Sequence, residues 1–287
     1  MSIAQLTRGR VPRAARRAAR RDPLLLAAII VVAVAALMAV LGPWLAPVPP
    51  EQLHAGPVDG PSSPQNLFGS DDLGRDILSR VLVGAAPSLF GPVVVVLLST
   101  LLGVVLSVTA AWFGGLARGV IARIVDVIFA IPGLVLAVLA VAMFGKGLVA
   151  PVLALSVAYV PVVARLTQTA ASRELAKPYV AALRIQGVSS AAICFRHLVP
   201  ALLPVIAAQA TIGFGYAMLD LSAISFLGLG AQPPAADWGS MIAGGQPGLL
   251  QGAPEQSAFP AALIVITVLA VGVLGARVTI WAEEKER

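Results

Sequence analysis

Charged side chains of both signs lie close together in one stretch, where Asp71, Asp72 and Asp76 are interleaved with Arg75 and Arg80. Carboxylate oxygens bind hard divalent cations, but the spacing of these aspartates does not fit an EF-hand loop. The interleaved arginines favour ion pairs and helix caps. The sequence therefore favours a solvated, self-paired cluster, with a cation site as the alternative.

Other side chains that could do chemistry are few and far apart. The two histidines, His54 and His197, are separated by about half of the chain. Cys194 is the single cysteine, so no intrachain disulfide can form. The sequence contains no Gly-x4-Gly-Lys-Ser/Thr phosphate loop. We therefore expect no catalytic residue, no metal site and no cofactor in this chain.

The composition indicates which elements position these residues. Of 287 residues, 58% are hydrophobic and 12% are charged, and the mean hydropathy is +0.90. A soluble domain carries about 25% charged residues. These values exclude an ordinary soluble enzyme, a disordered protein and a secreted disulfide scaffold. They predict an all-α polytopic membrane protein.

Long stretches without charge predict the transmembrane helices, each of which needs about 20 apolar residues. The second stretch is long, and we expect one helix at about 88–113 preceded by a non-helical approach at 84–87. The stretches that predict six spans are 23–50, 81–117, 127–145, 147–164, 197–219 and 256–276.

The basic residues predict the orientation of these spans. With both termini in the cytoplasm, all 20 Lys and Arg side chains except Arg75, Arg80 and Lys146 lie on the inner side. This distribution follows the positive-inside rule. The Arg-rich segment 1–22 is then a cytoplasmic anchor at membrane lipid, and neither a signal peptide nor a nucleic-acid-binding segment.

The predicted topology divides the rest of the chain. After segment 1–22 it comprises a first transmembrane helix at 23–46, an extracytoplasmic loop at 47–87, a core of five transmembrane helices at 88–282 and a cytoplasmic tail at 283–287. The core includes an inner segment at about 174–197 and an outer loop at about 228–257.

The inner segment is too long for a simple helix connection. Pro178 is placed to begin a helix and Gly187 to end it. Ser189 can cap a second short helix that runs to Arg196, before Pro200 begins the next span. Two short helices hinged at a glycine fit either a docking element for a partner protein or an amphipathic hairpin on the lipid surface.

Charged groups and prolines within the spans are candidates for function. We expect Asp126 to pair with Arg123 at i, i+3. Asp220 either faces a pathway, where it could meet a cationic group of a substrate, or forms a cap or a pair with a partner. Pro132 and Pro161 interrupt the hydrogen bonding of the third and fourth spans, as flexible points or as ordinary features of membrane helices.

Three ordered blocks of the sequence resemble ABC importer permeases of the dipeptide/oligopeptide/nickel group. Residues 67–80 resemble the outer-loop signature of the C-type permease, and residues 225–241 resemble its block after the fifth span. The inner segment resembles the EAA motif, which inserts into the ATPase subunit. The matching positions are Tyr179, Val180, Ala181, Ala182, Leu183, Arg184, Gly187, Arg196, His197 and Pro200.

Two kinds of departure affect the expected coupling. Ala181 stands where the motif has a glutamate, and Leu183 stands where it has alanine. Residues 274–277 also lack the usual aspartate after the last span. Docking must then depend on shape, on Arg184 and on neighbouring groups.

The resemblance implies a type I permease fold in a bacterial inner membrane, with the inner segment as the coupling helix. It implies a homologous B-type permease, two ATPase subunits that carry ATP and Mg, and an extracytoplasmic substrate-binding protein as partners. Di- or oligopeptide is the expected substrate, with nickel or another small solute as the alternative. A secondary transporter, a membrane-embedded enzyme and a structural subunit are the competing hypotheses.

The resemblance also suggests roles for residues outside the coupling segment. Those expected at the pathway or gate are Asp220, Ser225 and Pro132. Those expected to contact the binding protein are Asp71, Asp72, Arg75, Asp76 and Trp238. Trp238 could instead be an anchor at the membrane interface.

Overall fold

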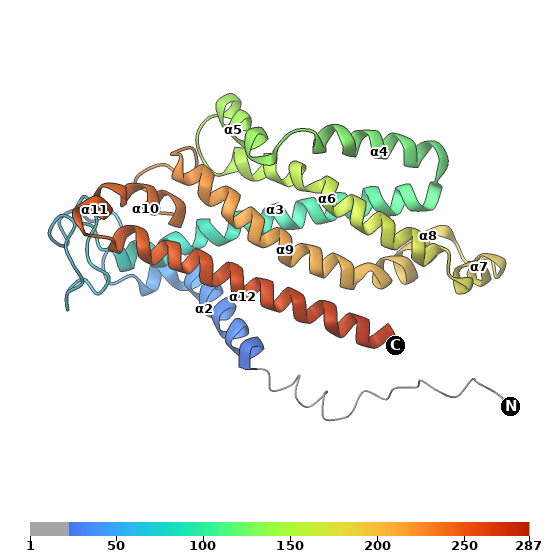
Figure 1. Ribbon diagram of the computed structural model, residues 1–287, viewed down its shortest axis with the longest axis horizontal. Coiled ribbons are helices and arrows are strands. Elements are labelled where there is room, and N and C mark those ends of the chain that lie inside the picture. The colour runs from blue at the N-terminus through green and yellow to red at the C-terminus, as the bar shows by residue number, and fades with distance from the viewer. Residues whose placement is uncertain (1–22, 287) are drawn as a thin grey trace.

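The computed structural model describes the backbone of residues 23–286 and the side chains of residues 23–278, so the predicted anchor at 1–22 lies outside the described part. That part is helical, with one isolated bridge between Ser70 and Asp76 (Figure 1). The helices are α2 (Pro23–Leu45), α3 (Ile77–Phe113), α4 (Gly115–Phe129), α5 (Gly133–Phe144), α6 (Val149–Leu175), α7 (Pro178–Ile185), α8 (Ser190–Ile193), a π-helical turn (Cys194–Leu198), α9 (Val199–Phe226), α10 (Trp238–Gly244), α11 (Gln246–Gln251) and α12 (Glu255–Glu286).

Five helical stretches of the described chain are long and apolar enough to cross a membrane, and α4 with α5 makes a sixth if the pair is one span. This agrees with the predicted fold class. The third span is not the single helix expected at 127–145, because α4 and α5 meet at an angle of 77°. Pro132 lies at the break, with an extended ψ of 131°. Proline lacks the N–H that would continue α4 and disfavours helical geometry in the preceding Ile131.

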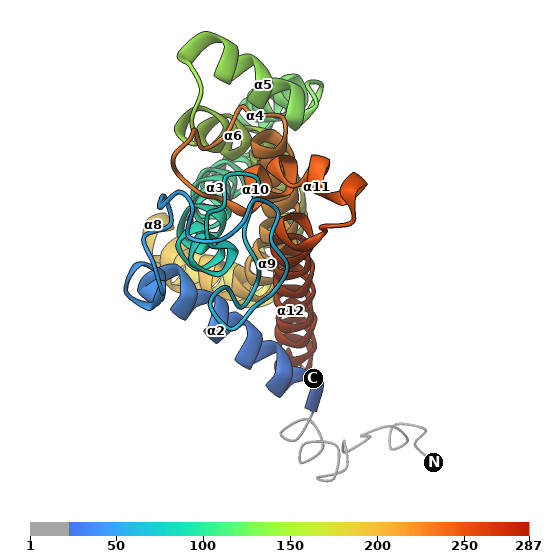
Figure 2. The ribbon, with the colours of Figure 1, turned by 90° about the vertical axis from the view of Figure 1, so that its left-hand side faces the viewer.

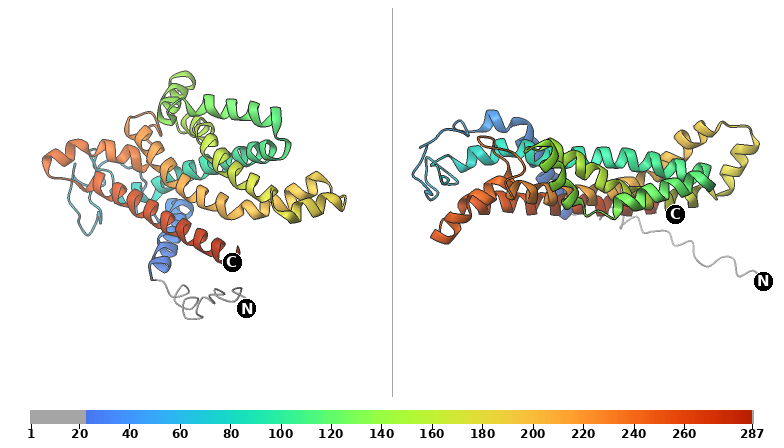
Figure 3. Two further views of the ribbon diagram at one scale, coloured as in Figure 1. Left: turned by 45° about the vertical axis from the view of Figure 1, so that its right-hand side comes forward. Right: turned by 90° about the horizontal axis from the view of Figure 1, so that it is seen from above.

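The long helices lie side by side around one axis of the molecule. In Figures 1 and 3, α3, α6, α9 and α12 run lengthwise, and α2 lies against α3 and α12. Helix α7 and the end of α12 lie toward one end, whereas α10, α11 and the loop between α2 and α3 lie at the other, which faces the viewer in Figure 2. The buried core between α3, α6 and α9 includes Val95, Leu155 and Ala217.

Helix α3 begins much earlier than predicted, at Ile77 rather than at about residue 88. Asp76 caps it, because its carboxylate accepts hydrogen bonds from the Ser79 backbone N–H at 2.8 Å and the Ser79 hydroxyl at 2.7 Å. The expectation of a non-helical approach at 84–87 is therefore wrong. A charged cap is a stronger start signal than Pro87, which the helix contains.

The inner segment begins as predicted but ends differently. Pro178 starts α7 and Ser189 caps α8, with the Ser189 Oγ accepting from the Ala192 N–H. The second helix does not stop at Arg196: it passes through the π-helical turn directly into α9. Pro200 has no N–H for the Arg196 carbonyl, and the turn shifts to i→i−5 bonding, with the Val199 N–H donating to the Cys194 carbonyl.

Candidate functional site

Helix α7 is held against the inner ends of α6 and α3 by one face. Val180, on the inward face of α7, is fully buried. The Tyr179 hydroxyl donates to Glu174 of α6 at 2.8 Å, and the Arg184 guanidinium lies 4.6 Å from the centre of the Trp112 ring. Such cation–π and hydrogen-bond contacts fix the orientation of a short helix that has little core of its own. Tyr179 and Arg184 therefore orient α7, rather than pointing freely outward.

Burial and the hydrogen bond to Glu174 raise the pKa of Tyr179 to about 12. The phenol thus stays protonated, and remains a donor, throughout the physiological pH range. The His197 ring lies 6.4 Å from the Tyr179 ring, so the turn before α9 contacts the start of α7. Arg196 and Pro200 of the same stretch are exposed.

Gly187 ends α7 in a left-handed conformation, with φ of 77°. Its N–H donates to the Arg184 carbonyl and the Val188 N–H donates to the Leu183 carbonyl, both at 3.1 Å. This pair of bonds is a Schellman motif, which strongly favours glycine. No atom lies within 4 Å of the position that a Cβ at residue 187 would occupy, so the space beside the motif is open.

The outward face of α7 carries small and apolar side chains. Ala181 and Ala182 are exposed. Ile185, one turn after Ala181, is 88% exposed, and Phe195 beside the hinge is 76% exposed. We refer to Ala181, Ala182, Ile185 and Phe195 as the inner apolar tip. Ile185 and Phe195 are not among the predicted coupling residues, although the i, i+4 spacing of Ala181 and Ile185 indicates a shared apolar face.

The charged cluster of the outer loop is a structural network. Asp71 is 0% exposed, and its carboxylate accepts a hydrogen bond from the Arg75 Nε at 2.7 Å. It also accepts from the backbone N–H groups of Leu73 and Arg75, and it forms an ion pair with the Arg80 Nε at 3.4 Å. Asp76 is buried in its cap and also accepts from Asn66. The predicted self-pairing is confirmed, but the expectation of a solvated cluster is wrong, because Asp71, Asp76 and Arg80 are buried. Of the three aspartates, only Asp72 is exposed enough to meet a binding protein, and the predicted contacts of Asp71 and Asp76 are wrong.

Trp238 is also enclosed within the chain. Its side chain is 0% exposed, and its indole Nε1 donates to the Val81 carbonyl at 3.0 Å. It packs between α3 and α12, where Asp237 caps α10. The expectations that Trp238 contacts a binding protein or anchors at the membrane interface are therefore wrong. Its role is to attach the outer loop to the helix bundle.

Asp126 pairs with a different arginine from the predicted one. Its carboxylate accepts from the Arg165 guanidinium of α6 at 2.7 Å, and Arg165 also lies 4.4 Å from the centre of the Phe129 ring. The expected i, i+3 pair with Arg123 does not form. Local pairs on one helix contribute only about 0.2–0.5 kcal/mol, so the packing of α4 on α6 decides the partner.

A groove between α3, α6 and α9 contains a carboxylate of α9. Asp220 lines it and accepts a hydrogen bond from the Tyr159 hydroxyl at 2.8 Å. The cavity volume is about 290 Å³. Its remaining lining is apolar apart from Ser99, Thr100, Gln209 and Tyr216. Ser225 is buried and does not line the groove, and Pro132 lies at the break between α4 and α5.

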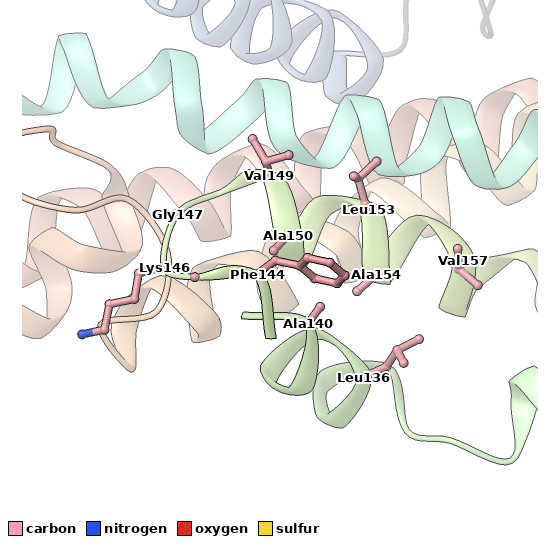
Figure 4. Close-up of a pocket in the computed structure, with 11 residues that line it drawn as sticks. Leu136, Ala140, Phe144, Lys146, Gly147, Val149, Ala150, Leu153, Ala154 and Val157 are labelled. Atoms are coloured by element: carbon pink, nitrogen blue, oxygen red, sulfur yellow. The ribbon is translucent and has the colours of Figure 1, made fainter. Parts of the chain in front are cut away.

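A second pocket lies between α5 and α6 (Figure 4). It has a volume of about 580 Å³ and is lined mainly by apolar side chains, among them Leu136, Phe144 and Val157. Lys146 lies at its edge, and its amine points away from the other labelled side chains. No set of polar groups converges there. Among the described residues, no group of three or more His, Cys, Asp or Glu side chains is arranged to hold a metal.

Comparison with known proteins agrees with this arrangement. The family described as "Binding-protein-dependent transport system inner membrane component" matches residues 103–284, and the "N-terminal TM domain of oligopeptide transport permease C" matches residues 13–64. The inward-facing MetNI methionine ABC transporter has a similar fold, with a TM-score of 0.53 and 23% identity, covering 71% of this chain and 93% of that chain.

Curated relatives are similar over most of the sequence. The Di/tripeptide transport system permease protein DppC of Pseudomonas aeruginosa is 36% identical, over 83% of this chain and 80% of its own length. The Peptide transport system permease protein SapC of Escherichia coli is 37% identical, over 84% and 83%. The Glutathione transport system permease protein GsiD of Pectobacterium atrosepticum is 37% identical, over 76% and 71%.

The family models match both the α2 region and the helical core. The MetNI structure has a fold similar to that of this chain. The chain is a multi-pass inner-membrane subunit that works with other subunits. It belongs to the family of binding-protein-dependent transport system inner membrane components, the permeases of ABC importers.

Proposed function

We propose that this chain forms half of the translocation pathway of an ATP-driven importer of di- or oligopeptides. Three relatives with names that specify di/tripeptide, peptide or glutathione transport support the peptide class. A homologous B-type permease completes the pathway, and an extracytoplasmic binding protein delivers the substrate. ATP and Mg bind to two separate ATPase subunits, and this chain is a non-catalytic subunit.

The observation that carries the proposed coupling is the inner apolar tip. Ile185 and Phe195 lie on short helical elements beyond the long helices, and large exposed apolar side chains at a rigid tip are typical of protein contacts. Tyr179 and Arg184 fix α7 to α6 and α3. A displacement of α7 by an ATPase subunit would therefore pass to helices that line the pathway. This transmission does not depend on a glutamate at position 181, where this chain has alanine.

The test replaces Ile185 by Asp in the complete transporter. A carboxylate at the centre of an apolar contact would be desolvated without a partner, which is strongly unfavourable. We expect ATPase subunits to bind at least about tenfold more weakly, measured by titration of the ATPase subunits onto the permease pair in nanodiscs. ATP hydrolysis stimulated by the loaded binding protein should fall in parallel.

Leu250→Asp is the matched control. Leu250 lies on α11 at the opposite end of the molecule and is 92% exposed, so the same change of chemistry is made far from α7. ATPase binding should be unchanged in this variant. Equal ATPase affinity for Ile185→Asp and the wild type would show that α7 is not the docking element.

A further inference from the structure

The groove between α3, α6 and α9 contains a carboxylate whose charge is not compensated. Asp220 forms no ion pair with any described residue, and none of the residues lining the groove is Lys or Arg. Asp126 of α4, by contrast, is paired with Arg165. Ionisable groups inside a membrane protein are costly and pair with a partner or mark a substrate path. The ionised form of Asp220 therefore has no counter-ion among the described residues.

The geometry leaves one oxygen of Asp220 available. The Tyr159 hydroxyl donates to Oδ2, which holds the carboxylate in place. No hydrogen bond to Oδ1 is formed within the described part, and Asp220 is half-buried at the groove surface. Asp220 is not a helix cap either, because it lies within the last two turns of α9 and its side chain bonds to α6. An incoming N–H donor can thus reach Oδ1 without breaking an existing bond.

Two further features suit a small polar ligand. Tyr216 precedes Asp220 by one turn on the same face of α9, is exposed and lines the same groove. An aromatic ring at this spacing suits a cation held by the carboxylate. Thr100 of α3 lines the groove as well, and its Oγ1 is buried without a hydrogen-bond partner in the described part. Unpaired buried hydroxyls are unfavourable unless a water or ligand satisfies them. The groove is apolar elsewhere, which matches peptide side chains.

We propose that Asp220, oriented by Tyr159, binds the α-ammonium group of the peptide during its passage. The inference rests on the proposed peptide import and specifies which substrate group this chain recognises. A charge-assisted hydrogen bond in a low-dielectric groove is strong and directional. Peptides with a free amino terminus would then be favoured over analogues without the charge, independently of the binding protein.

The first test measures uptake of labelled Ala-Ala and ATP hydrolysis in the same proteoliposomes, with the complete transporter and saturating binding protein. Asp220→Asn should lower uptake about tenfold while stimulated hydrolysis stays within about twofold. Asp220→Glu, which restores the charge, should recover most of the uptake. Ile212→Val, which trims the same groove without altering its charge, should behave as the wild type.

The second test removes the binding protein. Saturation-transfer NMR on the permease–ATPase complex in nanodiscs compares Ala-Ala with lactoyl-alanine, in which a hydroxyl replaces the ammonium group. The wild type should give stronger transfer to Ala-Ala, and Asp220→Asn should give equal transfer to both. If the wild type gave equal transfer to the two compounds, or no transfer to either, the proposal would be overturned.

The other outcomes are also decisive. Unchanged uptake by Asp220→Asn, with normal wild-type import, overturns the ammonium site and leaves the proposed function intact. Dissociation of the two permeases in Asp220→Asn assigns the carboxylate to the subunit interface and likewise overturns the site. Failure of the wild type to import any peptide overturns the proposed function, and the ammonium site with it.

Discussion

The contact between α3 and α6 depends on a glycine at a point where the two helices lie close together. A Cβ built at Gly103 would lie 2.7 Å from both Cβ and Cγ1 of Val163, and 3.2 Å from the backbone N of Ala164. Val163 is β-branched and buried, so it has little freedom to move aside. The replacement Gly103→Ala therefore forces either the side chain of Val163 or the two helices apart.

Gly272 supplies the comparison that isolates this effect. It lies inside α12, and no atom lies within 4 Å of its added Cβ. Alanine is favoured over glycine in a helix interior by about 1 kcal/mol, and this preference applies to both sites. Overpacking costs about 1–3 kcal/mol. The free energy of unfolding of Gly103→Ala should therefore be about 1–3 kcal/mol lower than that of Gly272→Ala.

The assay is equilibrium unfolding of the two variants, purified in the same detergent and followed by far-UV circular dichroism. Gly272→Ala should be as stable as the wild type or slightly more stable, and Gly103→Ala should be the least stable of the three. If Gly103→Ala matched or exceeded Gly272→Ala, the close approach of α3 and α6 would not be limiting, and the steric argument would fail.

Four other substitutions test the contacts that position the functional elements. Trp238→Phe leaves the Val81 carbonyl without its indole donor and should lower the free energy of unfolding by about 1–3 kcal/mol, measured in the same way. Asp76→Ala removes the cap of α3 and should cost about 0.5–2 kcal/mol; an unchanged unfolding midpoint would contradict its capping role. The Asp126–Arg165 pair is half-exposed, so the Asp126→Asn and Arg165→Gln single variants and the double variant should give a coupling energy below about 1 kcal/mol in a double-mutant cycle.

Composition and charge distribution determined the class of the protein. Apolar stretches of bilayer length have few stable solutions other than helices, and the basic residues predicted which ends lie inside. Local signals were equally informative where one residue acts on its own backbone. Pro178, Ser189 and Gly187 were read as helix boundaries, and the structure places them there.

Local signals were insufficient where several compete. The expected start of α3 follows Pro87, and only the folded loop shows that the Asp76 carboxylate caps a helix that begins earlier, at Ile77. Pro200 was read as the beginning of a new span, whereas a π-helical turn carries the helix past it. In each case the energy of continued helical hydrogen bonding and packing outweighs the preference of one residue.

The partners of charged and aromatic side chains were decided by tertiary structure alone. Asp126 meets Arg165 of another helix, and Trp238 is buried although its sequence context suggested a surface. The sequence also leaves open whether Asp220 caps a helix, and the structure shows that its carboxylate instead accepts from Tyr159 of α6. Sequence spacing fixes which face of a helix a side chain occupies, but the crossing of helices far apart in the chain fixes what that face meets.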